Sequence, residues 1–226
     1  MRIGLIGGTF NPIHKGHLKV AGEIFDRFKL DSVIFIPSSQ PPHKKIEKIA
    51  ESFHRLCMVA IATLHNPNFM VSFNELMRKG RSYSIKTIEE LKNRFGKKTE
   101  FYFTVGIDAF LEISTWKDVD LLFKNCHFIV NSRPGYEDND IIDILSKTVQ
   151  PKYKSISFKL LEKKKNYRNI KVKNSKYSIF VVEIPALNIS STAIRKKISE
   201  GKSVSEFLPE GVEAYIKKNK LYINNK

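Results

Sequence analysis

Cysteine is scarce in this sequence: Cys57 and Cys126 are far apart and form no C-x-x-C pair. This scarcity argues against a disulfide framework or a cysteine-based metal site, and because both residues fall in apolar segments we expect buried thiols. Long apolar runs are also missing, and a strand-like segment already begins at Ile3, which leaves no room for a signal peptide. We therefore expect a cytoplasmic protein without a membrane partner.

Acidic residues are few, with 23 Asp and Glu against 39 Lys and Arg, which gives a formal charge of +16. Much of the excess lies between Lys147 and Lys176, where Glu162 is the single acid. Aromatic residues among these lysines also suit a nucleic-acid-binding surface, but a solvated basic stretch is the simpler interpretation. We expect no nucleic-acid partner and predict a partly mobile insertion over about residues 147–178, without a second domain.

The most informative stretch is GGTFNPIHKGH, from Gly7 to His17, between an apolar run and an amphipathic segment. It predicts a strand that ends in a phosphate-binding turn and leads into a helix. Gly7 and Gly8 lack a Cβ, so a phosphate can approach the backbone closely, and the helix start offers N–H groups and a positive dipole end. His14 and His17 lie on one side of that helix start. Two imidazoles beside backbone donors suit a phosphoryl group that gains negative charge as it reacts.

Two better-known nucleotide motifs are absent. No Lys-Ser or Lys-Thr follows at the offset of a P-loop, and Gly4, Gly7 and Gly8 do not form G-x-G-x-x-G. An H-x-x-H pair also occurs in metal sites, but no Glu lies between these histidines and no Cys is nearby. A glycine-rich turn with two surface histidines is the other interpretation, and the order of strand, diglycine, histidines and helix argues against it. We assign no metal-ligating residue.

Strand-like and helix-like segments alternate along the chain, which predicts an α/β fold with a mostly parallel central sheet and helices on both faces. The predicted strands cover residues 3–6, 33–36, 69–73, 101–105, 128–130 and 179–184. Ser52 and Ser84 are candidate N-caps of helices. Short helices around 204–208 and 212–216 are expected to form a small helical C-terminal end. We predict a single domain over residues 1–226.

Polar residues follow several predicted strands, at the edge where ligands bind in open α/β sheets. His43 and Lys44 follow the second strand and are candidates for gripping a second phosphate, although a solvated loop is the other interpretation. Gly106 and Asp108 follow the fourth, where the carboxylate either caps a helix or accepts hydrogen bonds from ribose hydroxyls.

The segment from Asn188 to Arg195 places hydroxyl groups and an arginine at a helix start. It predicts either a second anion site or an ordinary cap, provided by Ser190 or Ser191, with Arg195 in solvent. Trp116 lies in a polar turn and is either a core residue or a stacking platform for an aromatic ring.

GGTFNPIHKGH and ISSTAIR together resemble the nucleotidyltransferase superfamily with the H-x-G-H signature. PPHK, RSYS, GID, STWK and RPGY further resemble the bacterial nicotinate-nucleotide adenylyltransferase family, apart from the basic stretch. The resemblance implies a Rossmann-like fold that joins ATP and nicotinate mononucleotide with Mg²⁺, giving deamido-NAD and pyrophosphate. Phosphopantetheine and nicotinamide mononucleotide stay alternative acceptors. A basic nucleic-acid-binding protein with a vestigial nucleotide pocket is the alternative from another class.

The resemblance also assigns roles to residues. It implies as catalytic residues His14, His17 and Arg195. It implies as ATP-binding residues Gly7, Gly8, Thr9, Phe10, Gly106, Asp108, Ile189, Ser190, Ser191 and Thr192. It implies as substrate-binding residues His43, Lys44, Ser82, Tyr83, Ser84, Trp116, Lys117 and Arg133, with the tryptophan against the pyridine ring. Asn11 stands where many members have Asp, which weakens the case for a metal-binding carboxylate there, and a homo-oligomer is possible.

Overall fold

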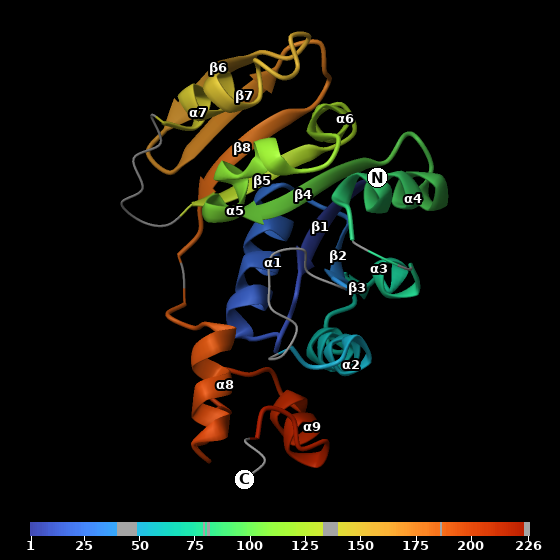
Figure 1. Ribbon diagram of the computed structural model, residues 1–226, viewed down its shortest axis with the longest axis vertical. Coiled ribbons are helices and arrows are strands. Elements are labelled where there is room, and N and C mark those ends of the chain that lie inside the picture. The colour runs from blue at the N-terminus through green and yellow to red at the C-terminus, as the bar shows by residue number, and fades with distance from the viewer. Residues whose placement is uncertain (40–48, 79, 81, 133–139, 186, 224–226) are drawn as a thin grey trace. The chain divides into compact units, whose positions relative to one another are not determined.

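The structure is a computed structural model that describes residues 1–39, 49–78, 80, 82–132, 140–185 and 187–223 (Figure 1). Its internal contacts divide the chain into two compact units. Unit 1 comprises Met1–Leu5 and Tyr83–Pro185, and unit 2 comprises Ile6–Ser82 and Ala186–Lys226. Each unit is therefore described separately, and the predicted single domain stays a prediction.

The strands have the order β3-β2-β1-β4-β5-β8-β7-β6 in an eight-stranded sheet. Their bounds are β1 (Arg2–Gly8), β2 (Ser32–Pro37), β3 (Phe69–Val71), β4 (Glu100–Gly106), β5 (His127–Ser132), β6 (Phe158–Lys164), β7 (Tyr167–Val172) and β8 (Ser178–Glu183). The pairs β2–β3, β4–β5 and β5–β8 are parallel, whereas β6–β7 and β7–β8 are antiparallel. The predicted α/β class with a mostly parallel sheet is confirmed.

The helices have the bounds α1 (Lys15–Arg27), α2 (Ser52–Thr63), α3 (Asn74–Met77), α4 (Ser84–Phe95), α5 (Ile107–Leu111), the 3₁₀ helix η2 (Ile113–Thr115), α6 (Val119–Phe123), α7 (Asp140–Thr148), α8 (Ser191–Ser199) and α9 (Val212–Lys218). Helices α8 and α9 make the predicted helical C-terminal end. The helix predicted around 204–208 is wrong, since that segment forms turns. Among the described residues, no helix has the length and apolar character needed to cross a membrane.

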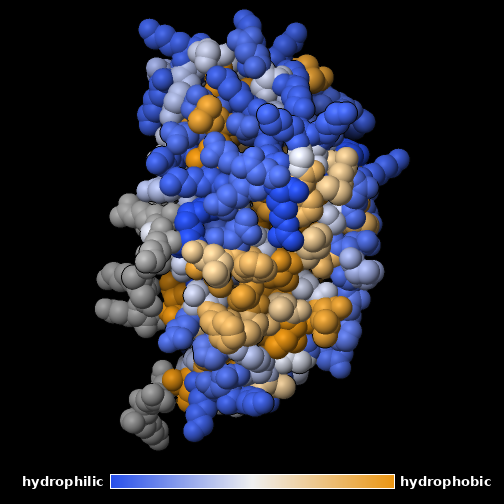
Figure 2. All heavy atoms as spheres, turned by 90° about the vertical axis from the view of Figure 1, so that its right-hand side faces the viewer, coloured by the Kyte–Doolittle hydropathy of each residue, from blue (hydrophilic) through white to orange (hydrophobic). Residues whose placement is uncertain are grey.

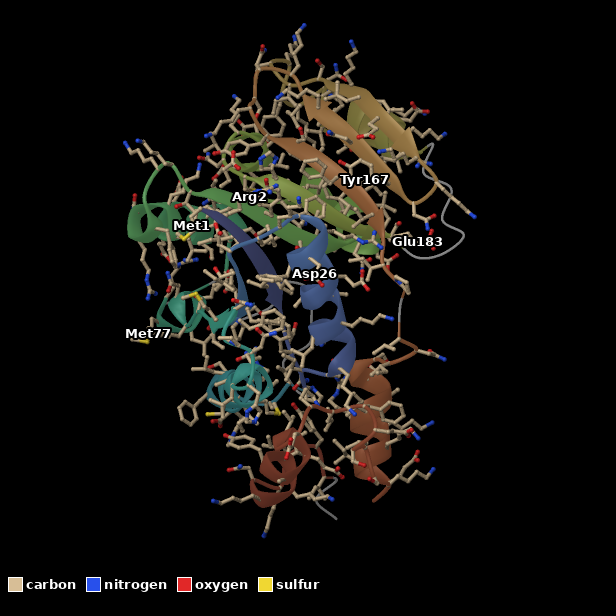
Figure 3. The ribbon with its side chains drawn as sticks, turned by 180° about the vertical axis from the view of Figure 1, so that it is seen from behind. Met1, Arg2, Asp26, Met77, Tyr167 and Glu183 are labelled. Carbon is tan, nitrogen blue, oxygen red and sulfur yellow. The ribbon has the colours of Figure 1, made fainter. Side chains whose placement is uncertain are left out.

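The core of unit 1 is built from aromatic rings that strands and helices bring together. Phe128 on β5 is fully buried and its ring centroid lies 5.8, 5.7 and 5.2 Å from those of Phe103, Phe110 and Phe123. Arg2, labelled in Figure 3, donates from Nε and Nη2 to the Tyr102 hydroxyl, at 3.1 and 2.9 Å. These contacts fix strand β4, which ends at Gly106, and Asp108 follows in the first turn of α5.

The core of unit 2 lies between the first strands and helix α2. Phe35, Met58 and Val59 are fully buried there. Figure 2 shows apolar side chains gathered on the surface over α2 and α3, and Phe53 and Met77 are 65% and 77% exposed. Exposed apolar patches are typical of interaction surfaces, and a homo-oligomer, named above as a possibility, stays untested.

The basic stretch, in which no strand was predicted, contains regular structure, and its interpretation as a partly mobile insertion stays a prediction. Within it, β6 and β7 form an antiparallel hairpin, and β7 continues the sheet at β8. Ile170 and Val172 alternate with exposed or half-buried polar residues and are buried. A register irregularity between Leu160 and Glu162 interrupts the alternation on β6, which lies at the edge of the sheet. Two buried residues and a bulge left too little periodicity in the sequence to predict strands.

Several local predictions were also wrong. Two N-caps were placed one residue too late, and one cysteine is less buried than expected. Helix α2 has Glu51 as its N-cap and helix α4 has Tyr83, so that Ser52 and Ser84 are the first helical residues instead of caps. Cys126 is buried as expected, and burial raises the pKa of its thiol, whereas Cys57 is only partly buried.

Candidate active site

The turn between β1 and α1 carries the central motif, in unit 2. Gly7 is exposed at the end of the strand, and Gly8 is half-buried. A Cβ on Gly8 would lie 3.1 Å from ring atoms of Phe10, which is buried and has a left-handed φ of 47°. A side chain at Gly8 would therefore crowd the Phe10 ring, which favours glycine at this position. The Phe10 ring in turn meets the His17 ring edge-on, with a centroid distance of 5.1 Å.

The two histidines of the motif lie against each other at the start of α1. Their ring centroids are 3.8 Å apart, and the backbone N–H of His14 donates to Nδ1 of His17 at 3.2 Å. Because Nδ1 accepts, the neutral His17 imidazole carries its proton on Nε2 and presents that N–H as a donor. The N–H of His17 itself donates to the carbonyl of His14 at 2.9 Å.

His14 is a buried and electrically neutral partner. It is 8% exposed, and burial lowers the pKa of its imidazole to about 4. Its Nδ1 is buried and has no hydrogen-bond partner among the described residues. A Cβ at Gly16 would lie 3.0 Å from this same Nδ1, so the glycine of the H-x-G-H signature makes room for the first imidazole.

The helix near the C-terminus meets the same turn, within unit 2. Ser191 Oγ donates to the carbonyl of Pro12 at 2.9 Å, and Arg195 Nη1 donates to the carbonyl of Asn11 at 2.8 Å. Ser190 is the N-cap of α8, and its Oγ accepts from the N–H of Ala193 at 3.1 Å. The predicted Ser190 cap is therefore confirmed, and α8 with its arginine lies beside the segment that leads to the histidines.

Asn11 acts as a junction in this turn. It is 5% exposed, and its Oδ1 accepts from the N–H of Ala50 at 3.0 Å and from the hydroxyl of Tyr222 at 2.8 Å. Two donors therefore occupy the oxygen that a metal-binding carboxylate would offer. An amide keeps both bonds without adding a buried negative charge, which gives a physical reason for Asn at this position.

Other assigned residues lie in unit 1, and their placement is described there alone. Gly106 is the N-cap of α5, and Asp108 lies in its first turn without capping it, so that the capping alternative for Asp108 is wrong. Trp116 is half-buried and meets Phe103 edge-on at 6.0 Å. Lys117 Nζ lies 4.8 Å from the ring centroid of Tyr83, which brings two of the assigned substrate-binding residues together.

The structure describes some of the remaining assigned residues, and the others lie outside the described ranges. Ser82 ends the first segment of unit 2, and its buried Oγ has no hydrogen-bond partner among the described residues. Thr192 is exposed, and Arg195 Nη2 lies 3.4 Å from its Oγ1. His43, Lys44 and Arg133 lie outside the described residues.

The sequence interpretation missed two residues that hold the turn from behind. Arg55 on α2 is 1% exposed and binds the carbonyl of Thr9, and Tyr222 binds Asn11 as above. Neither belongs to a recognisable motif. An arginine at an inward-facing position of an otherwise apolar helix was the one available signal for the first, because unpaired charges are rarely buried.

The sequence matches the cytidylyltransferase-like family over residues 5–197, a range that includes both the histidine pair and Arg195. The chain therefore belongs to this family of nucleotidyltransferases.

More specific names come from individual relatives that cover almost the whole chain. A protein from Thermoanaerobacter sp. (strain X514) named probable nicotinate-nucleotide adenylyltransferase is 43% identical over 222 residues, which are 98% of this chain and 94% of that protein. A protein of the same name from Geobacter sulfurreducens is 38% identical, with 100% of both chains covered.

Solved structures show the Rossmann-like fold. The Plasmodium falciparum nicotinic acid mononucleotide adenylyltransferase complexed with NaAD has a TM-score of 0.69 and 19% identity, and the match covers 98% of this chain and 97% of that one.

Proposed function

We propose that this protein transfers the adenylyl group of ATP to nicotinate mononucleotide, which gives deamido-NAD and pyrophosphate. The observation that carries the proposal is the pair of hydrogen bonds from Ser191 and Arg195 to Asn11 and Pro12, three residues or fewer before His14. They bring an arginine and a capped helix start to the histidine pair, from opposite ends of the chain. The relatives' names support the pyridine nucleotide as the acceptor over phosphopantetheine.

The reaction needs no covalent nucleophile from the protein. The 5′-phosphate of nicotinate mononucleotide attacks the α-phosphorus of ATP, one P–O bond forms, and the bond to pyrophosphate breaks in line. Catalysis then consists of positioning and of stabilising negative charge.

The described residues of unit 2 provide donors for that charge. The Nε2–H of His17 is fixed by the hydrogen bond that its Nδ1 accepts from His14. Arg195 uses Nη1 and Nη2 for bonds to Asn11 and Thr192, and a guanidinium has five N–H groups, so donors remain for a phosphate. The positive dipole end of α1 adds to these.

Mg²⁺ would bind through the substrate's phosphates. Among the described residues, no group of three or more His, Cys, Asp or Glu side chains could hold a metal ion, and Asn11 is not a carboxylate. Mg²⁺ at nucleotide sites commonly uses few protein ligands together with phosphate oxygens and water. When bound, it would withdraw charge from the transferring and leaving phosphates. With ATP and a free mononucleotide as substrates, we place the enzyme in the cytoplasm.

One assay tests the proposal. The purified protein is given ATP and Mg²⁺ with nicotinate mononucleotide, nicotinamide mononucleotide or phosphopantetheine, and pyrophosphate release is followed. We expect the highest kcat/KM with nicotinate mononucleotide. Absence of turnover with every acceptor, together with RNA binding that weakens steeply with salt, would instead support the nucleic-acid-binding alternative.

A further inference from the structure

Among the described residues, Arg55 is the most deeply buried charged side chain that the proposed reaction does not use. It is 1% exposed and lies on α2, in unit 2. Its Nε donates to the carbonyl of Ala50 at 2.9 Å, its Nη1 to the carbonyl of Thr9 at 2.8 Å, and its Nη2 to the carbonyl of Ser39 at 3.0 Å. One guanidinium thus joins three backbone positions that are far apart in the sequence.

Two of these three positions are also tied to the rest of the turn. The N–H of Ala50 donates to Oδ1 of Asn11, so Ala50 is bound through both its N–H and its carbonyl. Thr9 lies between Gly8 and Phe10, within the turn assigned to ATP. The N–H of Ser38, next to Ser39, donates to the carbonyl of Gly8 at 2.9 Å. Arg55 therefore supports the turn from the side that faces the protein interior.

The charge of Arg55 has an unusual environment. Its three acceptors are neutral carbonyls, and no carboxylate of the described residues forms an ion pair with it. Burial lowers the pKa of the guanidinium, although it stays protonated at neutral pH. Burying a cation costs free energy, and three hydrogen bonds to neutral carbonyls offset only part of the cost. An apolar residue would pack into α2 without this cost.

We propose that Arg55 is a positioning residue for adenylyl transfer, which fixes the turn at Thr9 by donating to its carbonyl. The inference rests on the proposed function. Arg55 acts through the turn, since its Nε, Nη1 and Nη2 donate to backbone carbonyls. Arginine is needed because only its planar fork directs three N–H groups at three separate carbonyls.

The test compares Arg55→Lys and Arg55→Gln with Arg94→Lys and Arg94→Gln, which make the same changes at an exposed position on α4. Folding is checked by circular dichroism and thermal unfolding, and kcat and KM are measured for each substrate in turn. Misplacing a catalytic turn by about 1 Å costs roughly a hundredfold in rate, so we expect kcat/KM for ATP to fall by that order in Arg55→Gln. The lysine variant keeps the charge and should fall less, with the loss mainly in kcat. Both Arg94 variants should match the wild type.

Rescue separates positioning from a merely structural role. Arg55→Ala is assayed with ethylguanidinium or, as a control of equal charge, ethylammonium at non-denaturing concentrations. We expect the planar cation to restore part of the turnover and the ammonium to restore none. Folded Arg55 variants whose kcat/KM for ATP stays within twofold of the wild type would overturn the proposal, as would unfolding of all three. Wild-type turnover is measured first. An inactive wild type would contradict the proposed function, whereas an active wild type with equally active Arg55 variants would contradict only the role of Arg55.

Discussion

At the scale of single residues, the candidate site depends on contacts between neighbouring residues. These contacts fix which nitrogen of one imidazole carries the proton and where the other imidazole ring fits. The His14 N–H sets the tautomer of His17, and Gly16 leaves space for the His14 ring. Both histidines could be singled out from the sequence because their spacing follows a motif with a clear chemical reason, and Arg195 because it lies at a helix start rich in hydroxyl groups. The catalytic roles of all three stay predictions. The sequence did not predict Arg55 or Tyr222, since their roles arise from contacts between distant segments that no local pattern encodes.

We expect His17→Ala to fold but to lose turnover. Removing one donor to a developing negative charge typically costs about 3 kcal/mol, or on the order of a hundredfold in kcat. Pyrophosphate release measures the loss. His65→Ala, which removes an exposed imidazole, is the matched control and should keep wild-type activity. Near-normal release by the His17 variant would remove that residue from the catalytic set.

Tyr222→Phe tests the bond between the C-terminal segment and Asn11. Burial raises the pKa of the Tyr222 phenol, so the hydroxyl is protonated and donates at neutral pH. Its loss should lower the free energy of unfolding by about 1 kcal/mol in urea titrations and raise KM for ATP. Tyr215→Phe removes a comparable hydroxyl, which lies 2.9 Å from Nδ1 of His54, and should lower stability without changing that KM. Equal KM values in the two variants would contradict a link between Tyr222 and the turn.

At the scale of elements, the sequence predicted most of the strands and long helices but not the β6–β7 hairpin. The buried strands β2, β4, β5 and β8 have continuous apolar runs, which can be recognised in the sequence alone. The strands of the hairpin are mostly solvated and lysine-rich. They form because β6 pairs with β7 and β7 pairs with β8, and such pairing between separate segments leaves no local pattern in the sequence. The caps of α2 and α4 were misplaced because a serine at the first helical position looks the same in sequence as a serine cap.

The register of the hairpin leads to a stability prediction. Lys163 on β6 lies directly opposite Arg168 on β7. Like charges in such a position are unfavourable, whereas an opposite pair contributes about 0.2–1 kcal/mol. Lys163→Glu should therefore raise the free energy of unfolding more than Lys165→Glu, which makes the same charge change in the turn after β6. A smaller gain for Lys163→Glu in urea titrations would show that the register is different.

At the scale of the whole molecule, stability should fall in mild acid. Burial lowers the pKa of His14 and of His127 to about 4, from an ordinary value of 6.5. Between these two pKa values the unfolded chain binds protons that the folded chain does not. The contribution of the two histidines to the free energy of unfolding is therefore constant above pH 6.5 and falls as the pH falls toward 4. Two such groups contribute at most about 2.7 kcal/mol per pH unit.

Urea titrations between pH 5 and 7 measure this dependence. The double variant His14→Asn, His127→Asn removes both groups, one from each unit, and should show a shallower loss of stability in acid than the wild type. His65→Asn, with its exposed ring, should keep the wild-type dependence. If the free energy of unfolding of the double variant falls with pH as steeply as that of the wild type, the acid sensitivity comes from carboxylates.

The turn after β1 is held by partners that come late in the chain, Arg195 and Tyr222. During synthesis on the ribosome, the histidine pair and Arg55 emerge early, whereas the Arg195 and Tyr222 side chains that also brace the turn are made only late. A nascent or prematurely terminated chain that stops before them lacks two of the bonds to Asn11. We expect adenylyl transfer to be slower in such chains than in molecules whose translation has run through to Tyr222.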